Sequence, residues 1–542
     1  MLTVTFTIYW IIVGGLFLYA LNSIYLVWSF RRHRKGQLER AHRIRAEYWA
    51  KAEEEDLPTV TIQLPIYNER YVAGRLIHAA AKVDYPRDKL EIQVLDDSTD
   101  DTVDVVAEHV DHYRKLGIRI VHLHRDNRDG YKAGALRDGV AATDSQLLAV
   151  FDADFVPEPD FLRKTVPFFE DGKVGMVQAR WGHANEKFSW LTRVQAIALD
   201  GHFGIEQGGR GWGGFFLNFN GTAGIWRKQA IEDAGGWEAD TLTEDIDLSY
   251  RAQLAGYRME YVVDVEVPAE LPADVFAFKS QQRRWAKGSI ECAKKLLPKI
   301  YAARIPFRQK VQATLHVTQH IVYCLVVMMA LLGLPLTASW HGDVHVAYYV
   351  AMIGLLVMIF AFPSILYVQA QKELRSDWRK RLRYMPVLMM VGTGVAVSNS
   401  RAVMEALLGI KTGFVRTPKR SMTGSKRDVK KAGTYKLPLD LTFVFEALLS
   451  VYCLVGLGLY LSTGRVIIGP FLALFSVAFG TMAIATFREA VSRRRENVAA
   501  AAADAEEAEE AELVMETERE YSEVLAEFRG DTEARKVAAA AV

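Results

Sequence analysis

Long uncharged runs alternate with segments of mixed polarity along this chain. Residues 2–30 contain no charged side chain, and this run is long enough to cross a bilayer as a tilted helix. Further apolar runs, each compatible with a spanning helix, cover residues 321–336, 344–370, 437–463 and 466–487. The pattern predicts a polytopic membrane protein with five crossings.

The placement of lysine and arginine predicts how these helices are oriented. Basic clusters begin at Arg31, Lys372 and Lys411, whereas "TASWHGDVH", residues 337–345, contains neither residue type. Because basic loops stay on the cytoplasmic side, we expect the N-terminus outside and the C-terminus inside. Residues 384–410 are apolar enough to span, but a crossing there would place the basic loop from Lys411 outside. We therefore expect this segment to be re-entrant or interfacial.

These patterns divide the chain into four parts. Residues 1–40 form the first membrane helix with its basic flank, and residues 41–306 have the polarity and size of one soluble domain, expected in the cytoplasm. Residues 307–490 hold the remaining membrane helices and a basic cytoplasmic loop at 411–436. Residues 491–542 are rich in alanine and glutamate, a composition that favours a solvated helix or disorder over a packed domain.

Composition narrows the classes of function. The 542 residues are 50% hydrophobic and 24% charged, which fits charged and apolar residues segregated into blocks. The net charge of +1 gives no reason to expect a nucleic-acid partner. The three cysteines, Cys292, Cys324 and Cys453, lack metal-ligand spacing and are interpreted as packing residues.

The soluble segment alternates strand-like and helix-like patterns. Apolar, β-branched runs at residues 59–69, 90–98, 118–125 and 145–154 each stop at polar residues, and helical patterns at 72–82 and 101–116 lie between them. This order predicts a doubly wound α/β domain, in which ligands bind beyond the carboxyl ends of the strands. Five polar residues would share that rim: Asn68, Asp96, Asp97, Asp152 and Asp154.

Two acidic motifs at the strand ends admit different interpretations. In "DDSTDDT", Ser98 or Thr99 could cap the helix that starts near Asp101, with the acidic residues favourable at its positive end. In "DAD", Asp152 and Asp154 can project toward a divalent cation that also holds a phosphate, although such a motif is common.

Two further motifs are also ambiguous. In "LTEDIDL", Thr243 fits an N-cap, but an ionised carboxylate from Glu244 or Asp245 could also serve as a general base for a hydroxyl. We expect that carboxylate to stay ionised at neutral pH, because it lies at a helix N-terminus. In "GYKAGAL", Lys132 could neutralise a phosphate that the small residues let approach, or the stretch could be a flexible loop.

The motif "QQRRW" lies just before the second apolar run. Arg284 can donate to a pyrophosphate, Gln281 lies three residues earlier on the same helical face, and Trp285 offers a flat surface suited to a sugar ring. Taken alone, an interfacial Arg/Trp anchor explains it as well. The order of Asp-Asp, Asp-x-Asp, Thr-Glu-Asp and Gln-x-x-Arg-Trp within one α/β domain favours a catalytic role.

This ordered set resembles the inverting family 2 glycosyltransferases of membrane polysaccharide synthesis, which include the cellulose and hyaluronan synthases. The likeness is greatest to the plant cellulose-synthase-like A glucomannan synthases, through "LDDSTDDT", "NRDGYKAGAL", "FNGTAGIWRKQAIEDAGGW", "TEDIDLSYRAQLAGY" and "VPAELPADVFAFKSQQRRWAKG". It covers residues 59–288. Downstream, "FVRTPK" resembles the gating loop of cellulose synthases, except that Arg416 replaces a valine.

The resemblance implies an α/β GT-A fold, a nucleotide-sugar-binding domain inserted between transmembrane helices. It implies Asp245, with Glu244 beside it, as the catalytic base. Implied donor-binding residues are Asp96, Asp97, Lys132, Asp152, Gln281 and Arg284. Implied ligands of Mg²⁺ or Mn²⁺ are Asp152 and Asp154. Implied acceptor-side residues are Trp285, Asn220, Gly221 and Thr222, and the implied gating residues are Phe414, Arg416, Thr417 and Lys419.

The expected function is transfer of a hexose from UDP-glucose or GDP-mannose to a growing β-linked polysaccharide, coupled to export. The expected location is a bacterial inner or plasma membrane, in contact with its lipids, and oligomerisation or accessory subunits could complete a pore. One alternative is a glycolipid synthase that adds one or a few sugars to a lipid, as ceramide glucosyltransferases do. Another is a transporter or receptor that binds nucleotide sugars without turnover.

Overall fold

The computed structural model describes residues 2–339, 346–413, 441–462, 469–492 and 494–495. Residues 1–432 and 440–486 form one compact unit, which holds the features described below except the end of the helix over Gly469–Ser492. A second unit of residues 433–439 and 487–542 lies almost wholly outside the described residues. So do the predicted gating residues Phe414, Arg416, Thr417 and Lys419, and residues 496–542 of the predicted tail.

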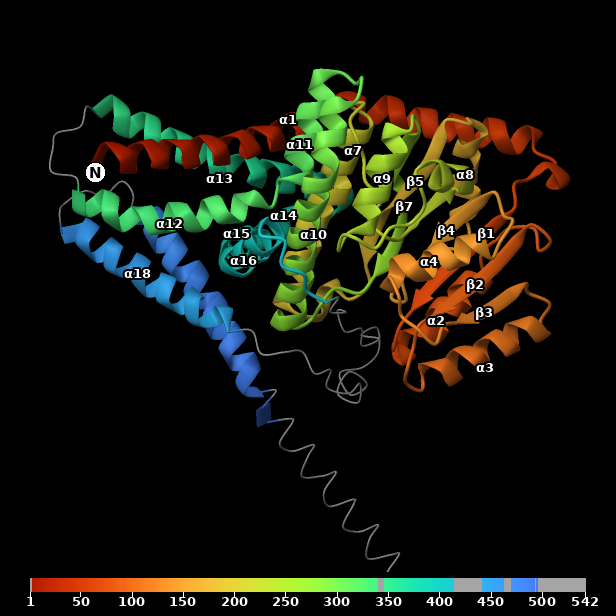
Figure 1. Cartoon of the computed structure of the whole chain (residues 1–542). Coiled ribbons are helices and arrows are strands. Elements are labelled where there is room, and N and C mark those ends of the chain that lie inside the picture. The colour runs from red at the N-terminus through yellow and green to blue at the C-terminus, as the bar shows by residue number, and fades with distance from the viewer. Residues whose placement is uncertain (1, 340–345, 414–440, 463–468, 493, 496–542) are drawn as a thin grey trace, which may run out of the picture. The chain divides into compact units, whose positions relative to one another are not determined.

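A seven-stranded mixed sheet forms the centre of the domain, in the order β3-β2-β1-β4-β6-β5-β7 (Figure 1). Strands β1 to β4 are parallel, β6 runs antiparallel to β4 and β5, and β7 is parallel to β5. The strands are β1 (Val60–Ile66), β2 (Leu90–Asp96), β3 (Ile120–His124), β4 (Leu147–Val150), β5 (Val174–His183), β6 (Gly224–Arg227) and β7 (Arg258–Ala269). The chain order reverses between β1 and β4, the position at which α/β sheets bind ligands.

Helices cover the sheet, and α10 leads from the domain to the apolar helices that follow. In the domain they are α2 (Arg70–Ala81), α3 (Thr102–Lys115), α4 (Tyr131–Ala141), α5 (Phe161–Thr165), α6 (Trp190–Gly201), α7 (Gln207–Gly211), α8 (Lys228–Asp233), α9 (Glu244–Leu254) and α10 (Val275–Ala302). Short 3₁₀ turns are η1 (Glu54–Asp56), η2 (Val166–Glu170), η3 (Glu186–Phe188) and η5 (Leu382–Tyr384), and η4 (His202–Glu206) is a π turn.

The apolar strand sequences are explained by burial on both faces of the sheet. In β4, Leu147 and Ala149 join one hydrophobic core, whereas Leu148 and Val150 join another. A strand that is covered on both sides carries apolar residues without alternation. All four predicted strands are confirmed, but β4 ends at Val150, so Asp152 and Asp154 stand beyond the sheet.

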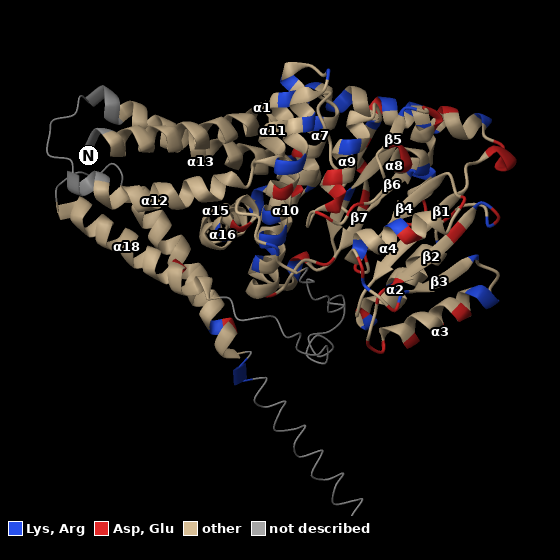
Figure 2. Ribbon diagram, viewed as in Figure 1, with Lys and Arg blue, Asp and Glu red and all other residues tan. Residues whose placement is uncertain are grey.

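The apolar runs form long helices in the described residues. They are α1 (Leu2–Lys51), α11 (Phe307–Val317), α12 (Ile321–Ser339), α13 (Val346–Leu374), α14 (Trp378–Arg381), α15 (Met385–Gly394), α16 (Ala396–Leu407), α18 (Thr442–Ser462) and a helix over Gly469–Ser492. Charged residues gather on the domain and are sparse along α12, α13 and α18 (Figure 2). This separation matches the predicted membrane protein.

Five of these helices are long and apolar enough to cross a membrane, and a sixth span is formed if the bent pair α11 and α12 is counted. The five include Trp378–Leu407, which we predicted to be re-entrant or interfacial. This segment is the most buried of the five candidates. Its last helix, α16, lies against α10, where Lys294 donates to the carbonyl oxygens of Ala406 and Leu407. Whether the segment crosses the bilayer stays a prediction.

A buried ion pair connects α10 to the apolar helices that follow. Lys279 Nζ lies 2.8 Å from Glu446 Oε1 of α18 and 3.0 Å from Thr442 Oγ1. The two charged side chains are only 1% and 0% exposed. Because α10 also carries the Gln-x-x-Arg-Trp motif, this ion pair ties that motif to a helix more than 150 residues later in the chain.

Candidate active site

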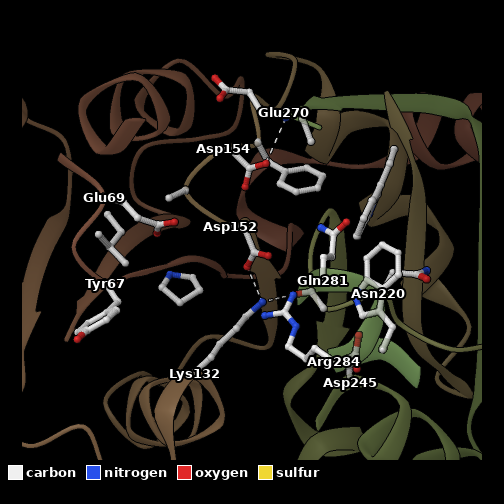
Figure 3. Close-up of a pocket in the computed structure, with 18 of the residues that line it drawn as sticks. Tyr67, Glu69, Lys132, Asp152, Asp154, Asn220, Asp245, Glu270, Gln281 and Arg284 are labelled. Atoms are coloured by element: carbon white, nitrogen blue, oxygen red, sulfur yellow. Dashed lines mark hydrogen bonds and ion pairs between the residues drawn. The ribbon is translucent and has the colours of Figure 1, made fainter. Parts of the chain in front are cut away.

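A cleft opens at the reversal point of the sheet, with a cavity volume of about 170 Å³. The segments that follow β1, β2 and β4 line one side of it, and α9 and α10 line the other. Figure 3 shows Lys132, Asp152, Gln281 and Arg284 converging on this space, with Asp154 and Glu270 at one side. The structure therefore brings together most of the residues that the sequence motifs single out.

Of the paired aspartates after β2, only Asp97 lines the cleft. Arg125 holds it through two hydrogen bonds of 2.7 Å, from Nε and Nη2. Asp96 is fully buried, 2.8 Å from His122 Nε2, and accepts a hydrogen bond from the backbone N–H of Ser98. Its position does not support the predicted contact with the donor, because consecutive residues at a strand end point to opposite sides.

The alternative interpretation of this turn as a helix cap also fails for Ser98 and Thr99. Helix α3 begins at Thr102 after the N-cap residue Asp101. The hydroxyl of Ser98 instead accepts a hydrogen bond from the backbone N–H of Asn68, at 2.9 Å. The turn after β2 is thus joined to the turn after β1.

Lys132 and Asp152 form an ion pair inside the cleft. The ammonium group also donates to the carbonyl oxygen of Gly221, at 2.7 Å. Burial alone would lower the pKa of Lys132, but the charges of Asp152, Glu244 and Asp245 outweigh it and raise the pKa. A permanent positive charge therefore sits among three carboxylates.

Asp154 lies two residues beyond Asp152 and is buried. The backbone N–H of Glu270 donates to Asp154 Oδ2 at 3.2 Å, and Glu270 itself lines the cleft. Oxygen ligands of this kind suit Mg²⁺ or Mn²⁺. The carboxylates of Asp152 and Asp154, together with that of Glu270 in the lining of the cleft, therefore fit a divalent cation by their chemistry.

Asp245 lies in the first turn of α9, next to Glu244. Thr243 occupies the N-cap position as predicted, but its hydroxyl contacts Cys292 Sγ at 3.3 Å and makes no cap hydrogen bond. Burial and the neighbouring charge of Glu244 raise the pKa of Asp245 to about 7, against the lowering effects of Lys132 and Arg284. The direction of this shift is opposite to the one expected from the helix N-terminus, because desolvation and the charge of Glu244 favour the protonated carboxyl group.

If Asp245 is the catalytic base of a nucleotide-sugar transferase, as the family resemblance implies, this pKa predicts how activity depends on pH. A base must be deprotonated to act, so kcat/KM should fall about tenfold for each pH unit below about 7 and level off above it. Initial rates of nucleoside diphosphate release between pH 5.5 and 8.5 would measure this. The variant Glu244→Gln should move the inflection to lower pH, since it removes a charge that raises the pKa. A rate that stays flat down to pH 5.5 would contradict the assignment.

Gln281, Arg284 and Trp285 lie on α10 and all line the cleft. The helix begins after Asp274, whose side chain accepts the backbone N–H of Ala277 at 2.7 Å. Farther along it, Gly288 packs against α9, where an added Cβ would lie 2.5 Å from Thr243 Cγ2. Glycine in "RWAKG" therefore lets the cationic helix approach the residue before Glu244.

The loop Asn220-Gly221-Thr222 lies over Asp245. Gly221 has φ of +80°, and a Cβ there would come 3.3 Å from Asp245 Oδ2. Asn220 lines the cleft, but Thr222 is fully buried. The backbone N–H of Asp152 donates to the Thr222 hydroxyl at 2.9 Å, so Thr222 supports the aspartate instead of meeting an acceptor directly.

A second, larger cavity of about 490 Å³ adjoins the first, and Asn220, Asp245, Gln281 and Trp285 line both. Its walls come from α1, α6, α12, α13 and α15. Two of its residues, His202 and Glu206, were missed by sequence reasoning, as were Glu270, which lines the first cavity, and Arg125, which holds Asp97 there. His202, Arg125 and Glu270 contact residues distant in sequence, and Glu206 contacts His202 and Arg210, one helical turn away, so no motif marks any of them.

Carboxylates and cations gathered at the reversal point of a mixed α/β sheet are the arrangement found in GT-A glycosyltransferases. The domain therefore has a fold of the GT-A type.

Comparison with known proteins identifies the family of the segment that forms the sheet domain. Residues 58–288 match the model described as glycosyltransferase like family 2, so this segment is a family 2 glycosyltransferase domain, as predicted. Glucomannan 4-beta-mannosyltransferase 1 of Oryza sativa subsp. japonica is 43% identical over 248 residues, 45% of this chain and 48% of the relative. Glucomannan 4-beta-mannosyltransferase 2 of Arabidopsis thaliana is 39% identical over 307 residues, 54% of this chain and 58% of the relative.

Among solved structures, a mannosyltransferase from Pyrobaculum calidifontis in complex with GDP-Man and Mn²⁺ is similar at 19% sequence identity. The TM-score is 0.46, over 72% of this chain and 99% of that chain. The chain spans about half the length of the curated relatives it matches. These relatives come from plants, and they give no support to the predicted bacterial membrane.

Proposed function

We propose that the protein transfers a hexose from a nucleotide sugar to the end of a growing β-linked polysaccharide. The observation that carries this proposal is the position of Asp245, which lines both the cationic cleft and the larger cavity. A base at that junction can meet a donor on one side and an acceptor on the other. The mannosyltransferase names of the relatives favour a mannosyl donor.

In the proposed reaction, Asp97 contacts the nucleoside, and Gln281, Arg284 and Lys132 bind the diphosphate. Asp152 and Asp154 would hold Mg²⁺ or Mn²⁺, which supplies charge neutralisation for the leaving group when bound. In this structure Lys132 already contacts Asp152, so donor binding would shift the ammonium group toward phosphate oxygens.

Asp245 removes the proton from an acceptor hydroxyl as its oxygen attacks the anomeric carbon. The new bond joins that oxygen to C1, and the broken bond joins C1 to the β-phosphate oxygen. The nucleoside diphosphate leaves with the bonding electron pair, and Asp245 keeps the proton. A single displacement inverts the anomeric centre, so an α-linked donor yields a β-linkage. Trp285 provides the face on which the acceptor sugar stacks.

The larger cavity supports a route for the product. It continues from Trp285 into a space lined by Tyr323, Phe360 and Tyr367 of the apolar helices. Aromatic and polar side chains along one path suit a carbohydrate, since rings stack on sugar faces while polar groups meet hydroxyls. A growing chain could therefore leave through these helices, which is the coupling to export that we propose.

The purified full-length protein should release nucleoside diphosphate from one of four donors, namely GDP-mannose, UDP-glucose, UDP-galactose and UDP-N-acetylglucosamine. Release should require Mg²⁺ or Mn²⁺ and stop when a chelator is added, because the diphosphate would otherwise leave unneutralised. The product should be a polymer that a matching β-glycanase degrades. A lipid-soluble product would replace this proposal with glycolipid synthesis, and absence of release from all four donors would overturn it.

A further inference from the structure

A single turn of π-helix connects α6 to α7. The turn η4 has π geometry over His202–Glu206, with α-helix on both sides. Such single π turns inside α-helices occur frequently at functional sites. Two side chains of this turn, those of His202 and Glu206, line the larger cavity.

His202 joins the π turn to the loop above the catalytic base. Its Nδ1 lies 3.1 Å from Glu206 Oε2, and its Nε2 lies 3.0 Å from Asn220 Oδ1. Gly221 follows Asn220 in the chain and lies close to Asp245, since a Cβ added to Gly221 would come 3.3 Å from Asp245 Oδ2. The His202 ring therefore fixes a side chain on the acceptor side of the base.

Glu206 carries a negative charge into the cavity. Burial would raise the pKa of its carboxyl group, but His202 and Arg210 outweigh burial and hold the pKa at about 2. Arg210 Nη1 lies 3.5 Å from Glu206 Oε2, the same oxygen that His202 contacts. Among the described residues, none donates a hydrogen bond to the other oxygen, Oε1.

That second oxygen is accessible from the cavity, since the Glu206 side chain is 23% exposed and lines it. An ionised oxygen in a largely enclosed space gains much from a hydrogen-bond donor. The donor would have to come from a molecule in the cavity that presents hydroxyl groups. An alkyl chain offers none, whereas every hexose offers several.

We propose that Glu206 Oε1 accepts a hydrogen bond from a hydroxyl group of the acceptor sugar, and that His202 positions Asn220 against the same acceptor. This inference rests on the proposed transferase function and adds a site that selects a carbohydrate acceptor over a lipid. Glu206 is then a binding residue, and His202 is a positioning residue that acts through Asn220.

The test is a titration of the full-length protein in detergent with β-1,4-mannotetraose and with cellotetraose. Trp181 and Trp285 line the cavity, so their fluorescence reports occupancy. Glu206→Gln should weaken binding of the preferred oligosaccharide by about 10- to 100-fold, because it replaces a charged acceptor with a neutral one. His202→Ala should weaken it less, and His202→Gln should recover part of the loss.

A matched control is Glu232→Gln, a change of the same type at an exposed glutamate on α8. It should leave oligosaccharide binding unchanged. Nucleoside diphosphate affinity, measured in the same samples, should change less than twofold in Glu206→Gln, which separates an acceptor effect from a general loss of folding.

Equal oligosaccharide affinity in wild type and Glu206→Gln would overturn the inference, as would a wild-type protein that binds neither tetrasaccharide. A parallel loss of nucleoside diphosphate affinity would overturn it too, since the effect would then not be specific to the acceptor. The titration requires no turnover. A protein that binds oligosaccharide through Glu206 but releases no nucleoside diphosphate would refute the proposed transferase and leave this site standing.

Discussion

Replacing Asp245 with asparagine is expected to lower the rate of sugar transfer by about 10²- to 10⁴-fold, the contribution typical of a general base. Asparagine keeps the size of the side chain, and its Oδ1 can still accept the backbone N–H of Ile246, which lies 2.9 Å away in the native chain. The loss should therefore appear in kcat, with the affinity for nucleoside diphosphate largely preserved. Steady-state kinetics and a binding titration on the same preparation would separate the two quantities.

The control for this variant is Asp233→Asn on the exposed end of α8, far from the lining of either cavity. It should retain wild-type kinetics. A protein that merely binds nucleotide sugars, as a transporter or receptor would, has no need of a base. Full transfer activity in Asp245→Asn would contradict the role of Asp245 as the base. Nucleotide-sugar binding that is equal in wild type and Asp245→Asn, with no transfer by either, would favour the binding class.

Replacing Lys279 with methionine should destabilise the protein by about 3–5 kcal/mol, because it leaves the charge of Glu446 buried beside an apolar group. The double variant Lys279→Met, Glu446→Leu should recover much of this loss, since no buried charge then remains. Denaturation in mixed micelles, followed by tryptophan fluorescence, would give the free energies of unfolding.

The exposed ion pair between Lys51 and Glu170 provides the comparison. Lys51→Met should cost no more than about 1 kcal/mol, because solvent already screens that pair. If the single and double variants at the buried pair were equally unstable, loss of packing and not the uncompensated charge would be the cause.

Local sequence was sufficient to predict four of the seven strands of the domain, and β5, β6 and β7 were not predicted. Strands β1 to β4 consist mostly of apolar, β-branched residues, so they and the acidic residues after them could be located from the hydrophobic pattern, although Gln63 and Gln93 lie buried within β1 and β2. The motif order then placed Lys132, Asp152, Asp245 and Arg284 in one cleft, where the structure has them.

The sequence analysis departs from the structure at residues whose surroundings depend on tertiary contacts. Asp96 and Asp97 are identical in sequence terms, and only the strand pairing shows that one meets His122 while the other meets Arg125. The pKa of Asp245 depends on burial, which a helix N-terminus does not reveal. His202 is relevant to the site because its ring contacts Asn220, which lies 18 residues later in the chain. None of these relationships has a periodic or local signal.

The ion pair between Lys279 and Glu446 also bears on how the protein is made. Its two residues are 167 positions apart in the sequence. A ribosome that adds roughly 5–20 residues per second needs about 10–30 s to pass from one to the other. During that interval the sheet and the Arg284 helix are already synthesised, whereas the helix that carries Glu446 is not. The contact between these two helices is therefore one of the last to form, and a chain released before residue 446 would lack the Glu446 carboxylate that Lys279 contacts.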